Sequence, residues 1–146
     1  MPNPYLYAVI CAFIAILIYI AFRAMRRRRY VPELIDELEG RDFEVYCADL
    51  LAKNGFYDVE ITKGSGDYGL DILAERDGVT YGIQCKRYDK PIGVAAVQQA
   101  YAGRDYYGRM VGAVMTNQFF TDAAVKMAQA LNVLLWDRAY IEEMES

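Results

Sequence analysis

Residues 66–88 read GDYGLDILAERDGVTYGIQCKRY, and this stretch decides the fold of the chain. Two runs, each with alternating apolar and polar residues, lie on either side of the dipeptide Asp77-Gly78. Asp-Gly between two such runs is a strong short-range signal for a β-hairpin. The stretch therefore predicts two antiparallel strands, at about 68–76 and 79–88, joined by a two-residue turn.

The turn determines which residues of the two strands face each other. With a two-residue turn, the residue numbers of every cross-strand pair have the same sum, so Asp71 lies opposite Gln84. Opposed residues share one face of the sheet, with Cβ atoms about 4.5–5.5 Å apart. Side chains alternate along a strand, so Lys86 shares this face and lies opposite Gly69. Gly82 takes the same face, and we expect the glycines to leave space for a ligand above the converging polar side chains.

The other face of the hairpin is predicted to be core. On spacing alone the polar face has a simpler interpretation, since any solvent-facing ribbon carries alternating polar residues. Glu44 favours a site, because apolar residues at i+3, i+4 and i+7 place it at the edge of the buried side of its helix, within reach of Asp71. The expected core positions of the hairpin are Leu70, Ile72, Ala74, Tyr81, Ile83 and Cys85.

The rest of the chain after residue 40 alternates helices and strands. A helix is predicted from Asp42, its expected N-cap, to the stop at Gly55. This order of elements is typical of an α/β domain with a mixed sheet. The helix buries Phe43, Tyr46, Cys47, Leu50 and Leu51. The other expected elements are strands at about 57–62, 111–116 and 133–136, helices at 93–108 and 121–131, and a short closing helix.

Residues 5–22, YLYAVICAFIAILIYIAF, contain no charge, Gly or Pro. At about 1.5 Å per residue this stretch spans about 27 Å, which is close to the hydrocarbon core of a bilayer. It predicts a single transmembrane helix; a buried core helix is disfavoured because the remaining chain is too small to surround it. A cleaved signal peptide is disfavoured because the positive charges follow the apolar run. Five Arg within residues 23–29 predict an outside N-terminus and a cytoplasmic C-terminal domain, and residues 23–39 form a basic, then acidic juxtamembrane linker.

Composition excludes several kinds of chemistry. The chain has no His, so it has no Ser-His-Asp triad and no His-ligated zinc or haem. Its three Cys have no CxxC spacing, which argues against a disulfide framework or a structural zinc site. Any catalysis must therefore use carboxylates, Lys, Tyr or Cys.

Several motifs together resemble the Mrr-like restriction endonucleases, in the PD-(D/E)XK nuclease superfamily. GDYGLD at 66–71 and IQCKRY at 83–88 resemble the catalytic signature of that family. The resemblance extends over residues 41–146, through Phe43-Glu44, LLxxxGF at 50–56 and MTNxFFTDAA at 115–124. It implies an endonuclease domain over residues 40–146, with a restriction-endonuclease-like mixed β-sheet flanked by helices.

The resemblance also implies roles for individual residues. Asp71 is the central metal carboxylate, and Gln84 occupies the position that is Glu or Asp in most of the superfamily. Lys86 is the catalytic lysine, and Glu44 is an auxiliary acid, so that Asp71, Gln84 and Glu44 form the implied metal site. Two auxiliary residues are expected as well: Asp67, which matches the family pattern, and Gln98, which faces the site from the second helix.

These residue types suit Mg²⁺-dependent hydrolysis of DNA. Hard oxygen ligands favour Mg²⁺, which polarises a phosphoryl oxygen and lowers the pKa of a water. Lys86 is expected to stabilise charge in the transition state, because the nearby carboxylate of Asp71 favours its protonated form and disfavours a role as base.

Residues 30–146 carry 11 Lys and Arg against 20 Asp and Glu, a net charge of −9, which argues against strong sequence-independent DNA binding. A homodimer, an additional specificity subunit or membrane localisation is expected to compensate. Phosphate contacts are predicted for Arg87, Lys90, Arg104 and Arg109, with a solvated surface as the alternative for each. Tyr101, Tyr106 and Tyr107 are expected to pack the helix against the sheet, and stacking on bases is their alternative role.

The sequence thus predicts a membrane-anchored, Mg²⁺-dependent DNA endonuclease that acts in restriction of foreign or modified DNA. The alternative is a catalytically silent nuclease-fold module that tethers a partner or nucleic acid at the cytoplasmic membrane face.

Overall fold

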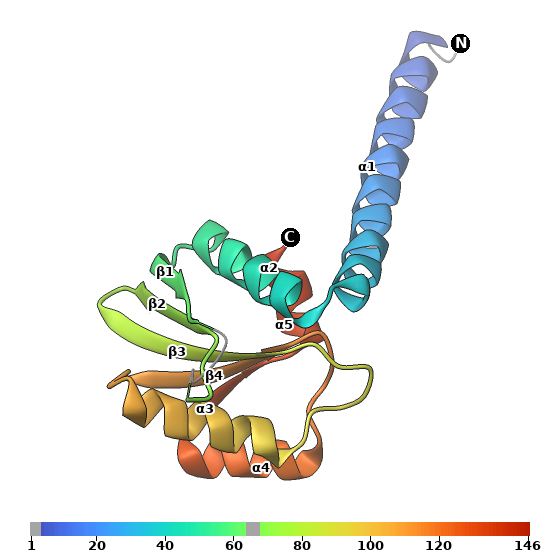
Figure 1. Cartoon of the computed structure of the whole chain (residues 1–146). Coiled ribbons are helices and arrows are strands. Elements are labelled where there is room, and N and C mark those ends of the chain that lie inside the picture. The colour runs from blue at the N-terminus through green and yellow to red at the C-terminus, as the bar shows by residue number, and fades with distance from the viewer. Residues whose placement is uncertain (1–3, 64–67) are drawn as a thin grey trace.

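A mixed sheet with helices on both faces forms the folded domain (Figure 1). The structure is a computed structural model that describes residues 4–63 and 68–146, and within the N-terminal helix it describes the side chains of residues 7, 9–23 and 34–37. The strand order is β1-β2-β3-β4-β5, antiparallel from β1 to β3 and parallel from β3 to β5. The predicted mixed α/β fold is therefore confirmed. The strands are β1 (Tyr57–Ile61), β2 (Ile72–Arg76), β3 (Val79–Lys86), β4 (Val111–Thr116) and β5 (Val133–Trp136).

The helices divide the core into two layers (Figure 1). Helices α2 (Gly40–Lys53) and α5 (Arg138–Met144) cover one face of the sheet. Helices α3 (Val94–Tyr106) and α4 (Asp122–Leu131) cover the other face and supply the two parallel crossovers. The β2–β3 hairpin, which carries most of the predicted site, is part of this sheet. Helix α2 therefore packs on one face of the sheet and α3 on the other.

The hairpin has the predicted register. Asp77 and Gly78 have φ of 52° and 77°, the left-handed conformation that a two-residue type I′ turn requires at both positions. The pairs run from Arg76↔Val79 to Ile72↔Ile83. The next pair in this series is Asp71 with Gln84, as expected.

Three expected boundaries differ from those observed. Strand β2 begins at Ile72, because Tyr68 and Gly69 have φ of 48° and 87° and so are not extended. The N-cap of α2 is Glu39, and Asp42 lies in the first turn, where a carboxylate interacts favourably with the helix dipole. The N-terminal helix α1 (Pro4–Glu37) is continuous, so the linker expected at 23–39 is helical up to Glu37.

Large apolar side chains along the described part of α1 before residue 23 are exposed, whereas the domain has a buried apolar core. In the described part of the chain, no helix combines the length and the apolar character needed to cross a membrane. The transmembrane helix expected at 5–22 is therefore not supported by the structure, whose described side chains in this stretch are those of residue 7 and residues 9–22.

The last turn of α1 belongs to the folded domain. Ile35 is fully buried, and Asp36 accepts hydrogen bonds from Arg138 Nη2 at 2.5 and 2.6 Å and from Asn117 Nδ2 at 2.7 Å. Arg87 donates to the Asp36 carbonyl oxygen. Burial opposes ionisation of Asp36, but the hydrogen bonds from Arg138 and Asn117 and the charges of Arg138 and Arg87 outweigh it and lower its pKa.

Candidate active site

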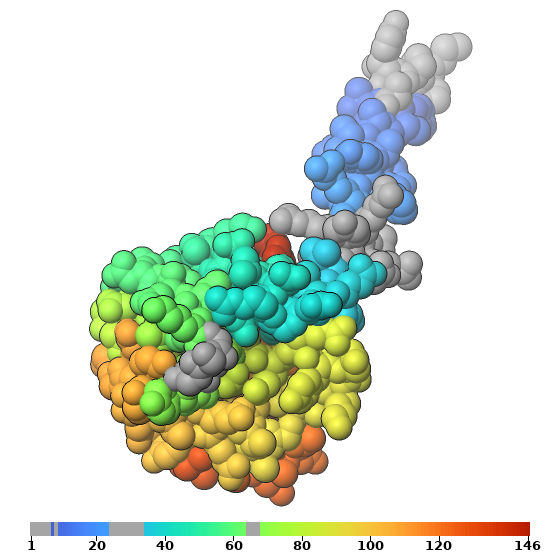
Figure 2. Space-filling view, viewed as in Figure 1, coloured from blue at the N-terminus to red at the C-terminus, as the bar shows by residue number. Residues whose placement is uncertain are grey.

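A cleft of about 610 Å³ contains the four residues expected to form the site: Glu44, Asp71, Gln84 and Lys86. They come from α2, from the residue before β2 and from β3. Residues of α3, among them the predicted auxiliary Gln98, line its other side. In the space-filling view α2 lies above this region and α3 below it (Figure 2). The structure thus brings five of the six predicted residues to one cleft, whereas Asp67 lies outside the described residues.

Asp71 and Gln84 are in direct contact and both are buried. Gln84 Nε2 donates a hydrogen bond to Asp71 Oδ2, and the backbone N–H of Cys85 donates to the same oxygen at 2.6 Å. Rotating the amide by about 180° exchanges Nε2 for Oε1, which presents an amide oxygen next to the carboxylate. The pair is therefore a potential set of hard oxygen ligands.

The backbone around Asp71 is fixed from both neighbouring strands. Its N–H donates to the Ile83 carbonyl at 2.8 Å, and its own carbonyl accepts from the Thr62 N–H at 2.9 Å. The hydroxyl of Thr62 also donates to the Leu70 carbonyl at 2.8 Å. Thr62 was not singled out from the sequence, where nothing distinguishes it from an ordinary strand residue.

Glu44 is held in place by a neighbour on its own helix. Arg41 Nη1 lies 2.7 Å from Glu44 Oε2, and the same nitrogen donates to the Thr62 carbonyl at 3.2 Å. The Glu44 side chain is 19% exposed, so it is reachable from the cleft. The i,i+3 spacing of Arg41 and Glu44 is a sequence signal that predicts this ion pair.

Asn117 fixes the chain just beyond Lys86. Its side chain accepts from the Tyr88 N–H and donates to the Tyr88 carbonyl, both at 2.9 Å, and it is fully buried. Asn117 Nδ2 also donates to Asp36, which links the end of α1 to the end of β3. Sequence reasoning placed Asn117 inside a family motif but did not give it this function.

The glycines of the hairpin do not leave open space, contrary to expectation. A Cβ on Gly82 would lie 2.4 Å from Leu70 Cδ1, and a Cβ on Gly103 would lie 2.6 Å from Leu70 Cγ. Leu70 therefore packs between the sheet and α3, on the face opposite to the one predicted. A Cβ on Gly69 would lie 2.8 Å from the Gln99 carbonyl oxygen, so this glycine admits the backbone of α3.

The expected core face behind the site is otherwise as predicted. Ile72, Ala74, Ile83 and Cys85 are buried in the cluster under α2, with Tyr81 packed against it. A hydrogen bond with Cys47 and burial, together with the charges of Asp71 and Glu44, raise the pKa of the Cys85 thiol well above its usual range. Cys85 is therefore a neutral thiol and a poor nucleophile.

Two of the predicted phosphate contacts have intramolecular partners. Arg87 pairs with Asp89 at 2.7 Å and donates to the Asp36 carbonyl. Arg104 pairs with Asp105 at 2.9 Å and lies over the Tyr101 ring at 4.6 Å. Both side chains thus have structural contacts instead of an open position beside the cleft.

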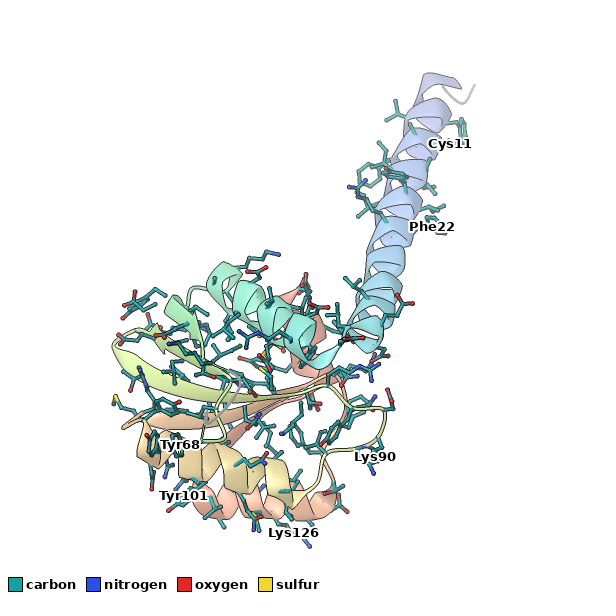
Figure 3. All side chains as sticks on the ribbon, in the orientation of Figure 1. Cys11, Phe22, Tyr68, Lys90, Tyr101 and Lys126 are labelled. Atoms are coloured by element: carbon teal, nitrogen blue, oxygen red, sulfur yellow. The ribbon has the colours of Figure 1, made fainter. Side chains whose placement is uncertain are left out.

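The two other predicted contacts, Lys90 and Arg109, also lie away from the cleft lining. Lys90 is exposed in the connection between β3 and α3, as Figure 3 shows, and Arg109 is half-buried beside Gly82. The structure therefore adds no support to these phosphate contacts.

The donor set of the cleft is small for a metal site and suits a cation that keeps several of its waters. Among the described residues, no group of three or more His, Cys, Asp or Glu is placed to hold a metal. The cleft offers two carboxylates and one amide, and Glu44 is paired with Arg41. Mg²⁺ commonly binds through one or two carboxylates and keeps several waters, so these residues fit that ion.

Comparison with known proteins identifies the family. Residues 35–144 match the Mrr_cat family, described as restriction endonuclease. A search of curated proteins gave no match.

Three solved structures share the fold. A protein of unknown function, AF1548, is 26% identical with a TM-score of 0.57, covering 66% of this chain and 57% of that chain. The DNA modification-dependent restriction endonuclease AspBHI is 16% identical with a TM-score of 0.61, covering 82% of this chain and 35% of that chain. The MspJI restriction endonuclease in complex with a 27-mer oligonucleotide is 14% identical with a TM-score of 0.59, covering 83% of this chain and 30% of that chain.

These likenesses differ in what they show. The AspBHI and MspJI structures, at such low identity, show the fold alone, and the chain spans 57% or less of each of the three structures. The family match rests on sequence and covers well over half of the 146 residues. The chain therefore belongs to the Mrr_cat family of restriction endonucleases.

Proposed function

We propose that this chain is a Mg²⁺-dependent endonuclease that hydrolyses DNA phosphodiester bonds in the cleft between α2 and α3. The observation that carries the proposal is the meeting of Glu44, Asp71, Gln84 and Lys86 in one cleft from three separate segments. Membership of a restriction endonuclease family supports the same reaction class.

Asp71, the Gln84 amide oxygen and Glu44 are the groups that would hold the cation. When bound, Mg²⁺ supplies positive charge at the phosphoryl oxygen and makes a nearby water more acidic. The Cys85 N–H holds one carboxylate oxygen of Asp71, which orients the other oxygen. The ion pair with Arg41 holds Glu44 at the edge of the cleft.

Lys86 supplies a second positive charge. It is half-buried at the end of β3 and lines the cleft beside Asp71 and Gln84. A protonated ammonium here stabilises the charge that develops on the phosphoryl oxygens as the nucleophile attacks. The clamp of Asn117 on Tyr88 limits the freedom of the chain that carries it.

The biological role we propose is restriction of foreign or modified DNA. The family assignment supports it, and AspBHI, with a similar fold, is described as modification-dependent. This chain spans only 35% of AspBHI, so recognition of a sequence or a modification is proposed to come from a homodimer or an additional subunit. The net charge of −9 over residues 30–146 favours such an additional source of DNA affinity.

Membrane attachment, with the N-terminus outside and the domain cytoplasmic, is a separate part of the proposal and rests on the sequence. The uncharged run at 5–22 and the five Arg that follow it support it. It is tested by carbonate extraction of membranes from cells that express the full chain: we expect the chain to stay with the membranes. Release into the supernatant would exclude an integral span.

One observation favours a catalytically silent module as the second candidate. The Gln84 amide donates to Asp71 and Arg41 pairs with Glu44, so both acids have partners without a cation. A silent module would bind nucleic acid or a protein without hydrolysis.

Plasmid cleavage by the full chain in mild detergent distinguishes the two candidates. We expect cleavage with Mg²⁺, none with EDTA, and none for Asp71→Ala or Lys86→Ala, whose folding is checked by circular dichroism. Lys126→Ala is the matched control, because Lys126 is an exposed lysine on α4 outside the cleft lining (Figure 3). Equal cleavage by wild type and the two cleft variants would show that the activity comes from another site or a contaminant. No cleavage by any of them would favour the silent module.

A further inference from the structure

Two tyrosines stack on each other at the edge of the cleft and are both exposed. The rings of Tyr68 and Tyr106 have centroids 3.8 Å apart and planes 21° apart. Their exposed fractions are 59% and 60%, so Tyr106 does not have the helix-to-sheet packing expected from the sequence. Tyr68 also lines the cleft that contains Asp71 and Lys86. We call this pair the tyrosine platform.

The platform is held by close backbone packing. Tyr68 has φ of 48°, in the left-handed region, directly before Gly69 with φ of 87°. A Cβ on Gly103 of α3 would lie 2.8 Å from the Tyr68 carbonyl oxygen, so only glycine lets the helix approach this turn. Figure 3 shows Tyr68 beside α3. The Tyr68 backbone is therefore fixed on the helix that also carries Tyr106.

The second tyrosine is braced from its own side. Tyr107 packs edge-on against the Tyr106 ring, with centroids 5.1 Å apart and an interplanar angle of 82°. A side-chain hydrogen bond with Tyr68 raises the pKa of Tyr106. Both rings are thus held by aromatic contacts and largely open to solvent.

A flat aromatic surface beside this cleft is suited to a nucleobase. Bases stack on aromatic side chains in single-strand binding proteins, and tyrosine provides this contact at low cost in conformational entropy. Inside a paired duplex both faces of a base are covered by its neighbours. Only an unpaired or terminal base offers a free face.

We propose that Tyr68 and Tyr106 bind an unpaired DNA base next to the phosphodiester in the cleft. The substrate class is then DNA with an unpaired base or a free end near the cleaved bond. This inference rests on the proposed nuclease function, which it makes more specific. It also supplies affinity that needs no phosphate neutralisation, which matters for a domain with a net charge of −9 over residues 30–146.

The test measures binding without hydrolysis. The full chain is titrated, in EDTA, into duplexes that carry 2-aminopurine either at an unpaired position or in the same sequence fully paired. We expect quenching of the unpaired probe and about tenfold tighter binding to the unpaired DNA, as one stacked base commonly provides.

Substitutions test whether the two rings, and not the rest of the surface, cause the preference for unpaired DNA. Tyr68→Ala and Tyr106→Ala are expected to remove most of this preference, whereas Tyr68→Phe and Tyr106→Phe keep the rings and are expected to retain it. Tyr57→Ala is the matched control, because Tyr57 is an exposed tyrosine on β1 that does not line the cleft.

The outcomes distinguish this inference from the nuclease proposal. Equal binding to paired and unpaired DNA, or an unchanged preference in both alanine variants, would overturn the tyrosine platform even if Asp71→Ala abolishes plasmid cleavage. Quenching that depends on the two rings would support the platform even if no plasmid is cut.

Discussion

Replacing Asp36 by Ala should destabilise the domain by about 2 kcal/mol near neutral pH. Asp36 accepts two hydrogen bonds from Arg138 and one from Asn117, at 2.5–2.7 Å. A hydrogen bond to a charged group contributes about 1.5–3 kcal/mol when buried. The Asp36 side chain is 43% exposed, and solvent screening reduces the value of the ion pair. What remains is mainly the cost of leaving the Arg138 guanidinium without this partner and the buried Asn117 amide without one of its two acceptors.

The predicted loss has a defined pH dependence. Because the pKa of Asp36 is lowered in the folded protein, its contribution is complete above the usual pKa of 3.8 and is lost as the pH falls through the folded value. The difference between wild type and Asp36→Ala should therefore shrink as the pH is lowered from about 7 to about 3.

Chemical and thermal unfolding of the full chain in detergent measure this effect. About 2 kcal/mol corresponds to a fall in Tm of about 4–8 °C for a protein of this size. Asp36→Asn should lose less, because its amide oxygen still accepts a hydrogen bond. Glu37→Ala is the control, because Glu37 is an exposed acid in the same turn. A variant as stable as wild type at pH 7, or a difference that does not change with pH, would refute the reasoning.

Two further substitutions test the site and its packing. Gln84→Glu places a second carboxylate against Asp71, so we expect the variant to be less stable than wild type in EDTA. Adding Mg²⁺ should raise the Tm of the variant more than that of wild type. Equal increases in Tm would argue against a cation between these residues. Gly103→Ala puts a Cβ 2.6 Å from Leu70 Cγ, and overpacking of this kind costs about 1–3 kcal/mol of unfolding free energy. Gly40→Ala, with no atom within 4 Å of the added Cβ, is the control and should leave the urea midpoint almost unchanged. If both glycine variants behave alike, the close approach of α3 is not a constraint.

The local sequence determined the hairpin and therefore the core of the site. A two-residue turn at Asp77-Gly78 sets the register over the whole hairpin, so the contact of Asp71 with Gln84 follows from residues within one short stretch. Glu44 was predictable for a similar reason, since helical periodicity states which side of α2 it occupies. The alternation of helices and strands was enough for the mixed sheet.

Long-range packing decided what the sequence did not show. Leu70 lies in the predicted strand pattern, yet the left-handed backbone at Tyr68 and Gly69 turns the chain and sends its side chain to the α3 face. The alternation of faces along a strand assumes an extended backbone, so it predicts the wrong face for Leu70, which precedes the start of β2.

The partners of Asp36 and Asn117 are equally invisible to local patterns. Asp36 lies 102 residues from Arg138 and 81 from Asn117 in the chain, and only the folding of α1 against the ends of β3 and β4 brings them together. The sequence determined by itself those contacts that depend on turn geometry and side-chain periodicity. Tertiary structure alone decided the contacts between distant segments, because no local periodicity encodes which surfaces will meet.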